Sequence, residues 1–339
     1  MLLIIGLGGV LWQVGNIYSS TSWGAEMKLQ MTHTEWGGLH VHDLIFPLFV
    51  YFSGIAQNFS LRKRQSEGRS SWKLLLHPWY RAFILVVLGW VVNGALVWDP
   101  QHMRYASVLG LIGISGALAA TFAQTLRHTC ALAISTVLIL GGVAAAQYWG
   151  GDLSPAGCVN ARIDAVLCPG KLYHTHFDPE GPLCILSATA LCLLGYLSGR
   201  VFSNSVSTGK RVLILACGGA ILLTAGLNLP VIKKIWTPGF VLAAGGIGAI
   251  LMALYHLLFD VSQWRFLSLP LRVVGTNALF IYLFTNIIRL NHVTERLFAG
   301  TFAAVLPTEW QHAALCCAYL LLAWGLCFFL YRKEIFIRV

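Results

Sequence analysis

The sequence predicts an all-α fold, a polytopic integral membrane helical bundle with about ten transmembrane helices. Its residues are 57% hydrophobic and only 11% charged, whereas soluble domains average about 45–50% apolar and about 25% charged. Apolar windows of about twenty residues, the length that crosses a bilayer, recur along the whole chain. Lys and Arg residues flank these windows, so the formal net charge of +10 indicates membrane topology and argues against a nucleic-acid partner.

The predicted spans follow one another without an intervening soluble domain, linker or repeat, so we expect one transmembrane domain over residues 1–339. The first window begins at Met1 with no basic flank, and we therefore expect the natural reading frame to start upstream. In chain order the windows are residues 2–18, 41–60, 82–98, 105–123, 130–149, 182–199, 211–229, 237–258, 272–290 and 312–331.

The distribution of basic residues predicts that both termini are cytoplasmic. In that orientation fifteen of the 23 Lys and Arg residues lie in inner segments, as the positive-inside rule requires. The segment from His33 to Asp43 and the loops 150–181, 230–239 and 291–311 then face outward. Histidines and carboxylates therefore gather outside, while the basic clusters gather inside.

The segment from residue 32 to residue 54 places three histidines and two carboxylates directly before an apolar run. Ionisable groups at this depth are costly and are usually functional. His33 is the candidate general base, because an imidazole titrates near neutral pH; the alternative is an interfacial histidine that only bonds water. Asp43 either orients that imidazole or holds a substrate amine, unless it is simply an acid favoured at a helix N-terminus. His40 and His42 have an easy interfacial explanation.

A second outer loop, Tyr173 to Gly181, again presents imidazole and carboxylate just before a span. We expect this loop and the His33 segment to face one shared cavity. Its His174-x-His176 pair lacks a third ligand, so we expect no metal. Cys158 and Cys168 are the two cysteines of the outer loop, and we expect them to form a disulfide in an oxidising compartment.

Other polar residues near the spans allow more than one interpretation. Lys and Trp at positions 233, 234 and 236 are typical of interface anchors. The inner basic residues suit either phosphates or anionic lipid and topology. Asn93 and Asn277 either line a cavity or hydrogen-bond between helices.

The chain carries four motifs in this order: His33-x-x-Trp36-x-Gly38-x-x-x-x-Asp43-x-x-Phe46-Pro47-x-Phe49-x-x-x-x-Gly54, Phe177-Asp178-Pro179-Glu180-Gly181, Lys233-Lys234-x-Trp236-Thr237 and Asn277-Ala278-Leu279-x-Ile281-Tyr282. Together they resemble the heparan-α-glucosaminide N-acetyltransferase family and its bacterial relatives. One departure is that family members carry a Ser-Leu-Asp-x-x-Arg-Gly-like stretch before the first span, and this chain begins after that place.

The resemblance implies an enzyme that transfers acetyl from cytoplasmic acetyl-CoA to the amine of a glucosamine on the far side of the membrane. It places the catalytic histidine on His33 and the neighbouring acid on Asp43. For a bacterial relative the expected location is the inner membrane, surrounded by lipid, and we also expect a homodimer. We assign substrate binding to Asp178, Glu180, Lys234, Trp236 and Asn277, and binding of the co-substrate acetyl-CoA to Arg62, Lys63, Arg64, Arg81 and Asn93.

The residues leave two questions open. His33 either takes the amine proton directly or becomes acetylated as a covalent carrier. Two other functions fit the same topology: a proton-coupled small-molecule transporter, since buried His and Asp also form proton relays, and a membrane O-acyltransferase of a surface glycan.

Overall fold

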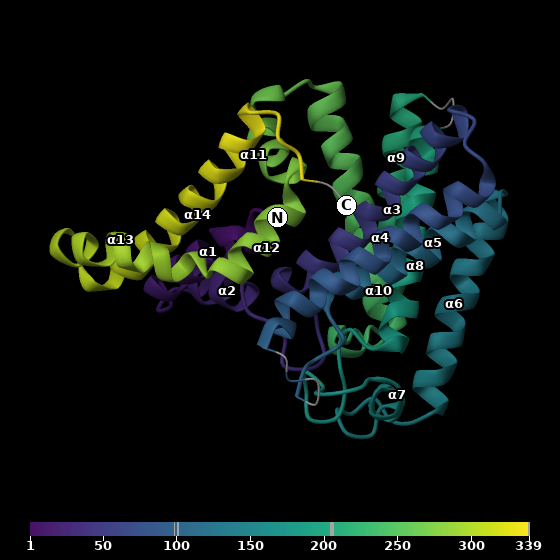
Figure 1. Cartoon of the computed structure of the whole chain (residues 1–339), viewed down its shortest axis with the longest axis horizontal. Coiled ribbons are helices and arrows are strands. Elements are labelled where there is room, and N and C mark those ends of the chain that lie inside the picture. The colour runs from purple at the N-terminus through teal and green to yellow at the C-terminus, as the bar shows by residue number, and fades with distance from the viewer. Residues whose placement is uncertain (98, 100–101, 204–206, 338–339) are drawn as a thin grey trace. The chain divides into compact units, whose positions relative to one another are not determined.

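The computed structural model describes residues 1–339 except 98, 100–101, 204–206 and 338–339. In the described part, all regular structure is helical apart from one isolated bridge between Arg104 and Gly170. The predicted all-α membrane bundle is therefore confirmed (Figure 1). The chain folds as two compact units: unit 1 comprises residues 1–35, 40–45 and 262–339, and unit 2 comprises residues 36–39 and 46–261. That the two units together form one transmembrane domain over residues 1–339 stays a prediction.

Unit 2 is built from the helices between residues 41 and 261, most of which are long and apolar. The most buried of them is α8, which contacts α5, α6 and α10. The first turn of α3 belongs to unit 1 and the rest of α3 to unit 2. The helices are α3 (Val41–Ser66), α4 (Ser71–Val92), α5 (Val108–Thr125), α6 (Thr129–Trp149), α7 (Val159–Leu167), α8 (Pro182–Ser203), α9 (Thr208–Leu227) and α10 (Pro238–Tyr255), which continues as a π-helix, His256–Val261.

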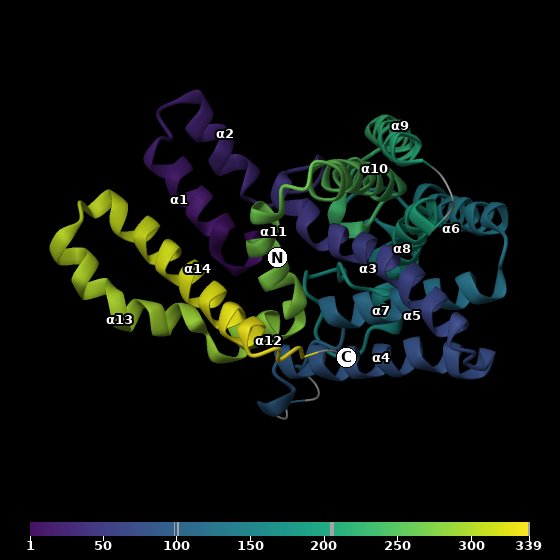
Figure 2. The ribbon, with the colours of Figure 1, turned by 90° about the horizontal axis from the view of Figure 1, so that it is seen from above.

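Glycines let the helices of unit 2 approach closely. A Cβ atom on Gly54 of α3 would overlap the carbonyl of Cys192 in α8, and one on Gly195 of α8 would overlap the carbonyl of Tyr51. In the neighbouring pair α9–α10 (Figure 2), a Cβ on Gly246 would lie 2.5 Å from the backbone nitrogen of Leu223. Small residues at such crossings are typical of membrane helices, where packing drives association.

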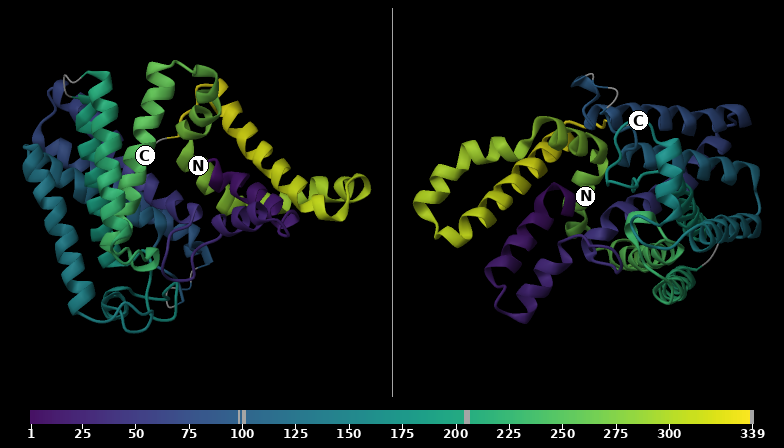
Figure 3. Two further views of the ribbon diagram at one scale, coloured as in Figure 1. Left: turned by 180° about the vertical axis from the view of Figure 1, so that it is seen from behind. Right: turned by 90° about the horizontal axis from the view of Figure 1, so that it is seen from below.

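Unit 1 gathers the two ends of the chain. Its last two helices lie side by side, as Figures 2 and 3 show. Its core contains Ile5, Val273, Ile281 and Ala323. The helices are a π-helical turn, Leu3–Leu7, then α1 (Gly8–Ile17), α2 (Ser22–Gln30), α11 (Arg265–Thr276), α12 (Ala278–Ile288), α13 (Leu290–Val305) and α14 (Thr308–Arg332).

The described residues contain eight helices long and apolar enough to cross a membrane, or nine if one bent pair counts as a span. The predicted number of ten was therefore too high. The window 2–18 forms only the short apolar segment Leu3–Ile17, in which the backbone leaves helical geometry at Ile5 and Gly6. The window 272–290 forms the bent pair, with residues 268–276 and 278–288 meeting at 68°.

Unit 2 has polar contacts at both of its ends, and each contact joins segments that are predicted to lie on the same side of the membrane. At one end, segments predicted to lie inside bond to one another: Arg62 Nη1 donates to the Ser203 carbonyl at 3.0 Å, and Arg200 Nη1 to Thr129 Oγ1 at 2.9 Å. At the other end, predicted outer segments meet, since Trp36 Nε1 donates to the Leu153 carbonyl at 2.8 Å.

The predicted disulfide between Cys158 and Cys168 is wrong, and both thiols are free. Cys158 immediately precedes the nine-residue helix α7 and Cys168 immediately follows it. A helix rises about 1.5 Å per residue, so the two Cα atoms lie roughly 15 Å apart, well beyond the roughly 7 Å limit for a disulfide.

The two ends of unit 2 should be accessible from opposite sides of the membrane. In a variant without reactive exposed cysteines, Lys171→Cys should react with an impermeant maleimide added to intact cells, and Lys63→Cys only after lysis. Leu138→Cys, which lies on α6 with 68% of its surface exposed in the protein, is the control and should stay unlabelled, because lipid covers it. Labelling of Lys171→Cys and Lys63→Cys from the same side would contradict the span order.

Candidate active site

His33 and Asp43 form a hydrogen-bonded pair at the start of α3. The distance between His33 Nδ1 and Asp43 Oδ1 is 2.7 Å. A carboxylate only accepts hydrogen bonds, so Nδ1 carries a proton, and in the neutral imidazole Nε2 then carries the lone pair. The His33 side chain is 54% exposed, whereas that of Asp43 has no exposed surface. The pair therefore presents an oriented imidazole base on a buried anion.

The position of Asp43 follows from the way in which α3 begins. Asp43 lies in the first turn of this helix, where an acid is favoured by the helix dipole. Its Oδ2 accepts the backbone N–H groups of Thr34 and His40, each at 3.2 Å. The bond back to His40, just before the helix, resembles that of an N-terminal capping box. One carboxylate thus closes the loop over the helix end and orients His33.

The other two histidines of this segment have different surroundings. The His42 ring meets the His33 ring edge-on, with centroids 4.4 Å apart. The His40 ring instead donates from Nδ1 to the Thr32 carbonyl at 3.0 Å. His42 therefore belongs to the surroundings of the pair, while the His40 ring fastens the loop.

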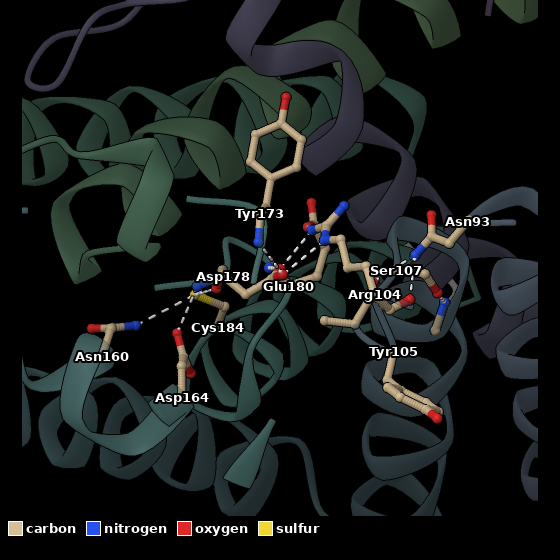
Figure 4. A network of polar contacts seen from close by, with 12 residues as sticks. Asn93, Arg104, Tyr105, Ser107, Asn160, Asp164, Tyr173, Asp178, Glu180 and Cys184 are labelled. Atoms are coloured by element: carbon tan, nitrogen blue, oxygen red, sulfur yellow. Dashed lines mark hydrogen bonds and ion pairs between the residues drawn. The ribbon is translucent and has the colours of Figure 1, made fainter. Parts of the chain in front are cut away.

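A second cluster of charges in unit 2 joins the loop before α5 to the loop before α8 (Figure 4). Arg104 donates from Nε to Asp178 Oδ2 at 2.7 Å and from Nη2 to Asp178 Oδ1 at 2.5 Å. Its Nη2 also contacts Glu180 Oε2. Such two-pronged Arg–carboxylate bonds are among the strongest in proteins, and here both aspartate oxygens are buried.

Further residues hold this cluster in place. Asp178 also accepts the N–H groups of Tyr173 and Glu180, each at 3.0 Å, and its own N–H donates to Asp164 Oδ2 at 2.9 Å. The Arg104 guanidinium lies over the Tyr173 ring at 4.6 Å. Asn93, at the end of α4, donates to the Arg104 carbonyl at 2.9 Å. Groups from both loops and from the end of α4 therefore hold the cluster in place.

The cluster contains three carboxyl groups but one cation, Arg104, and the pKa values of the three carboxyl groups are shifted. Burial raises the pKa of Glu180 to about 7, although Arg104 acts in the opposite direction. Burial also raises the pKa of Asp164 to about 6. For Asp178, the bonds and charge of Arg104 outweigh burial and lower the pKa. Arg104 thus keeps Asp178 ionised, and Glu180 holds a proton more readily than an exposed glutamate.

No family model matches the chain, but two curated proteins do. The human heparan-alpha-glucosaminide N-acetyltransferase is 23% identical over an alignment of 389 residues, which covers 91% of this chain and 55% of the human protein. The mouse protein of the same name is 24% identical over 319 residues, with 74% and 48% covered. The chain is distantly homologous to heparan-alpha-glucosaminide N-acetyltransferase. It spans about half the length of these curated relatives, and the predicted resemblance is confirmed.

Three of the residues assigned to the acceptor have contacts within unit 2 that explain their burial. Asp178 and Glu180 pair with Arg104. Trp236 is only 1% exposed and packs edge-on against Phe46 and Phe240, so it is not an interface anchor. Lys234 lies beside it in a short 3₁₀ turn. That these residues bind an acceptor stays a prediction.

The two asparagines hold backbone segments. In unit 1, Asn277 lies at the break between α11 and α12, donates to the Ile335 carbonyl at 3.0 Å and accepts the Ile337 N–H at 2.9 Å. Asn93 holds the backbone on both sides of Tyr105 in unit 2. Of the two roles that the sequence allowed, these bonds favour hydrogen bonding between segments over lining a cavity. A binding role for either residue stays a prediction.

The four basic residues assigned to acetyl-CoA lie in two neighbouring helices. Arg62 and Lys63 are exposed near the end of α3 and Arg64 is half-buried. Arg81 lies in the middle of α4, ten residues from its start, and its Nε is buried without a hydrogen-bond partner among the described residues. A charged residue inside a span is a functional candidate by its position.

Arg104 and Asp164 were not identified from the sequence. Arg104 is a lone cation in a short segment predicted to face outward, where basic residues are rare, and that exception was a usable signal. Asp164 gave no comparable signal, since its contact with the Asp178 N–H depends on how the loop folds. No group of His, Cys, Asp and Glu able to hold a metal ion comes together among the residues that the structure describes.

Unit 1 also contains a cavity of about 400 Å³ between α1, α13 and α14. Gln13, Asn291, Glu295 and His312 supply polar groups to its wall. Its volume lies within the range of small-molecule sites, about 300–1,000 Å³. The His33–Asp43 pair and a cavity of this size therefore belong to the same compact unit.

Replacing Arg104 should destabilise the protein strongly. Arg104→Met keeps the length of the side chain but leaves the buried Asp178 carboxylate without its cation, which costs about 3–5 kcal/mol. Thermal unfolding in detergent measures the effect. Arg162→Met, at an exposed arginine of α7, is the matched control and should change little. Equal melting temperatures for the two variants would show that the Arg104 cluster does not support the fold.

The stability of the cluster should fall as the pH rises from 5 to 8. A carboxyl whose pKa is raised in the folded state stabilises it below the unfolded value, and that contribution is lost as the pH rises through the folded value of about 7 for Glu180. The raised pKa of Asp164 acts with the same sign. Glu180→Gln should therefore show a smaller loss of melting temperature over this range than the parent protein. An unchanged slope would contradict the raised pKa.

Proposed function

We propose that this protein is an integral-membrane N-acetyltransferase that moves acetyl from cytoplasmic acetyl-CoA to the amine of glucosamine, or of a glucosamine-containing sugar, on the outer face. The single observation that carries the proposal is the His33–Asp43 pair, with its 2.7 Å bond and exposed imidazole. The distant homology to an N-acetyltransferase supports the reaction class. In a bacterium, the location would be the inner membrane, with both termini cytoplasmic.

The geometry of the pair suits both routes of acetyl transfer. In direct transfer, the amine nitrogen attacks the thioester carbonyl, its proton passes to His33 Nε2, and CoA leaves as the thiolate. In the two-step route, Nε2 attacks the carbonyl, CoA leaves, and the amine then takes the acetyl group from the imidazole. In both routes positive charge develops on the ring, and the buried Asp43 carboxylate, bonded to Nδ1, stabilises that charge.

The distribution of charge supports the sidedness of the proposal. Acidic side chains and the predicted outer loops meet at one end of unit 2, through Arg104 and Asp178, while Arg62 and Arg200 lie at the other end. Basic groups at the inner end suit the phosphates of acetyl-CoA. Asp178, Glu180, Lys234, Trp236 and Asn277 remain assigned to the acceptor, and Arg62, Lys63, Arg64, Arg81 and Asn93 to acetyl-CoA.

The proposal predicts that His33→Ala abolishes acetylation without unfolding the protein. General-base catalysis contributes roughly 10²–10⁴-fold, so release of CoA from acetyl-CoA in the presence of glucosamine should fall by at least about 100-fold. Binding of acetyl-CoA should persist, because the inner basic residues are unchanged. The assay uses purified protein in detergent, with free CoA measured with and without the amino sugar.

His40→Ala is the matched control for this experiment. It removes the ring that bonds to Thr32 but keeps the backbone N–H that bonds to Asp43, so most activity should remain. Near-normal acetylation by His33→Ala would move the chemistry to another residue. Release of CoA that does not depend on an amino sugar would contradict the assigned acceptor.

One observation favours a second candidate, a proton-coupled transporter. The helices on either side of Asn277 form a span bent by 68°, and broken helices are typical of transporter binding sites. Uptake of a labelled amino sugar into proteoliposomes, without any acetyl-CoA, would support that function and contradict the acetyltransferase.

A further inference from the structure

A second Asp–His pair lies in the π-helical turn that follows α10 in unit 2, at the end predicted to face inward. His256 Nδ1 lies 2.7 Å from Asp260 Oδ2, the same separation as in the His33–Asp43 pair. The burial is reversed, because here the imidazole is 7% exposed and the carboxylate 67% exposed. As Asp260 can only accept, Nδ1 carries a proton, and in the neutral imidazole Nε2 then carries a lone pair.

His256 Nε2 is buried and has no hydrogen-bond partner among the residues that the structure describes. A buried acceptor left in that state costs roughly 1–3 kcal/mol. The backbone at this point is also unusual, since residues His256–Val261 form a π-helical turn at the end of a membrane span. Such turns occur often at functional sites, and ionisable residues within spans are functional candidates.

The surroundings of His256 include the basic end of unit 2. The Phe202 ring of α8 meets the His256 ring edge-on at 4.9 Å. The next residue, Ser203, accepts the bond from Arg62 at 3.0 Å. That bond uses one of the five N–H donors of the guanidinium, and the Arg62 side chain is exposed. A cation suited to phosphate and a buried imidazole acceptor therefore lie beside consecutive residues of α8.

We propose that His256 Nε2 accepts a hydrogen bond from an amide N–H of the pantetheine arm of CoA, while Arg62 contacts the phosphates of the same molecule. This inference rests on the proposed function, and it adds a residue that the sequence did not assign. A CoA thioester is phosphorylated at one end and carries two amide N–H donors along its arm. Its two kinds of group match the two kinds of side chain at this end of unit 2.

Two ligands distinguish the contact of His256 with the pantetheine arm from the contact of Arg62 with the phosphates. CoA carries both the phosphates and the arm, whereas adenosine 3′,5′-bisphosphate carries phosphates without the arm. His256→Phe keeps an aromatic ring in place but removes the acceptor. It should weaken CoA binding by about three- to tenfold, as expected for one hydrogen bond, and leave bisphosphate binding unchanged. Arg62→Ala should weaken both ligands.

The control is His128→Phe, at an exposed histidine just before α6 in the same unit, and it should leave both affinities unchanged. Affinities are measured by calorimetry on the purified full chain in detergent. Unchanged CoA binding by His256→Phe would overturn the inference, and so would equal loss for both ligands, because the imidazole would then contact phosphate or only maintain the fold. If the parent protein bound no CoA, the proposed function itself would fail before His256 is considered.

Discussion

Taking a carboxylate out of water costs several kcal/mol unless charged or hydrogen-bonding groups replace that water, and each unit of this protein contains an aspartate with no exposed surface. In unit 1, Asp43 is satisfied by His33 and by two backbone N–H groups. In unit 2, Asp178 is satisfied by Arg104 and by two backbone N–H groups. Each anion therefore fixes the conformation of the loops around it, and the candidate chemistry depends on that order.

The two anions differ in the kind of partner that they hold, and this difference separates a supporting cluster from the candidate catalytic pair. The guanidinium of Arg104 stays charged at any physiological pH, and it keeps Asp178 ionised, so the Arg104–Asp178 pair joins the two loops across that range. The imidazole of His33 has a ring nitrogen that can accept a proton, so the same kind of buried anion holds a group that can act as a base. Because His33 is half-exposed while Asp43 is buried, a substrate can approach the imidazole without disturbing the carboxylate.

Much of the architecture was predictable from the sequence, because a membrane span needs only length and apolarity. The His33–Asp43 pair could also be predicted, since both residues lie in one short segment. The sequence could not show the break at Gly6 or the bend at Asn277, which lower the number of spans and depend on backbone geometry. Arg104 was missed because it is separated from Asp178 by 74 residues, and the disulfide prediction failed because an intervening helix holds Cys158 and Cys168 apart.

A double-mutant cycle on His33 and Asp43 tests the central claim, that the two side chains act as one reactive unit. The measured quantity is kcat/KM for acetyl transfer from acetyl-CoA to glucosamine, for the parent, His33→Ala, Asp43→Asn and the double variant. If Asp43 acts through the imidazole, the double variant should be no slower than His33→Ala alone, because the losses of residues that act as a unit are not additive. Losses that multiply, with the double variant slower by the product of the two single effects, would contradict the pair as the reactive unit.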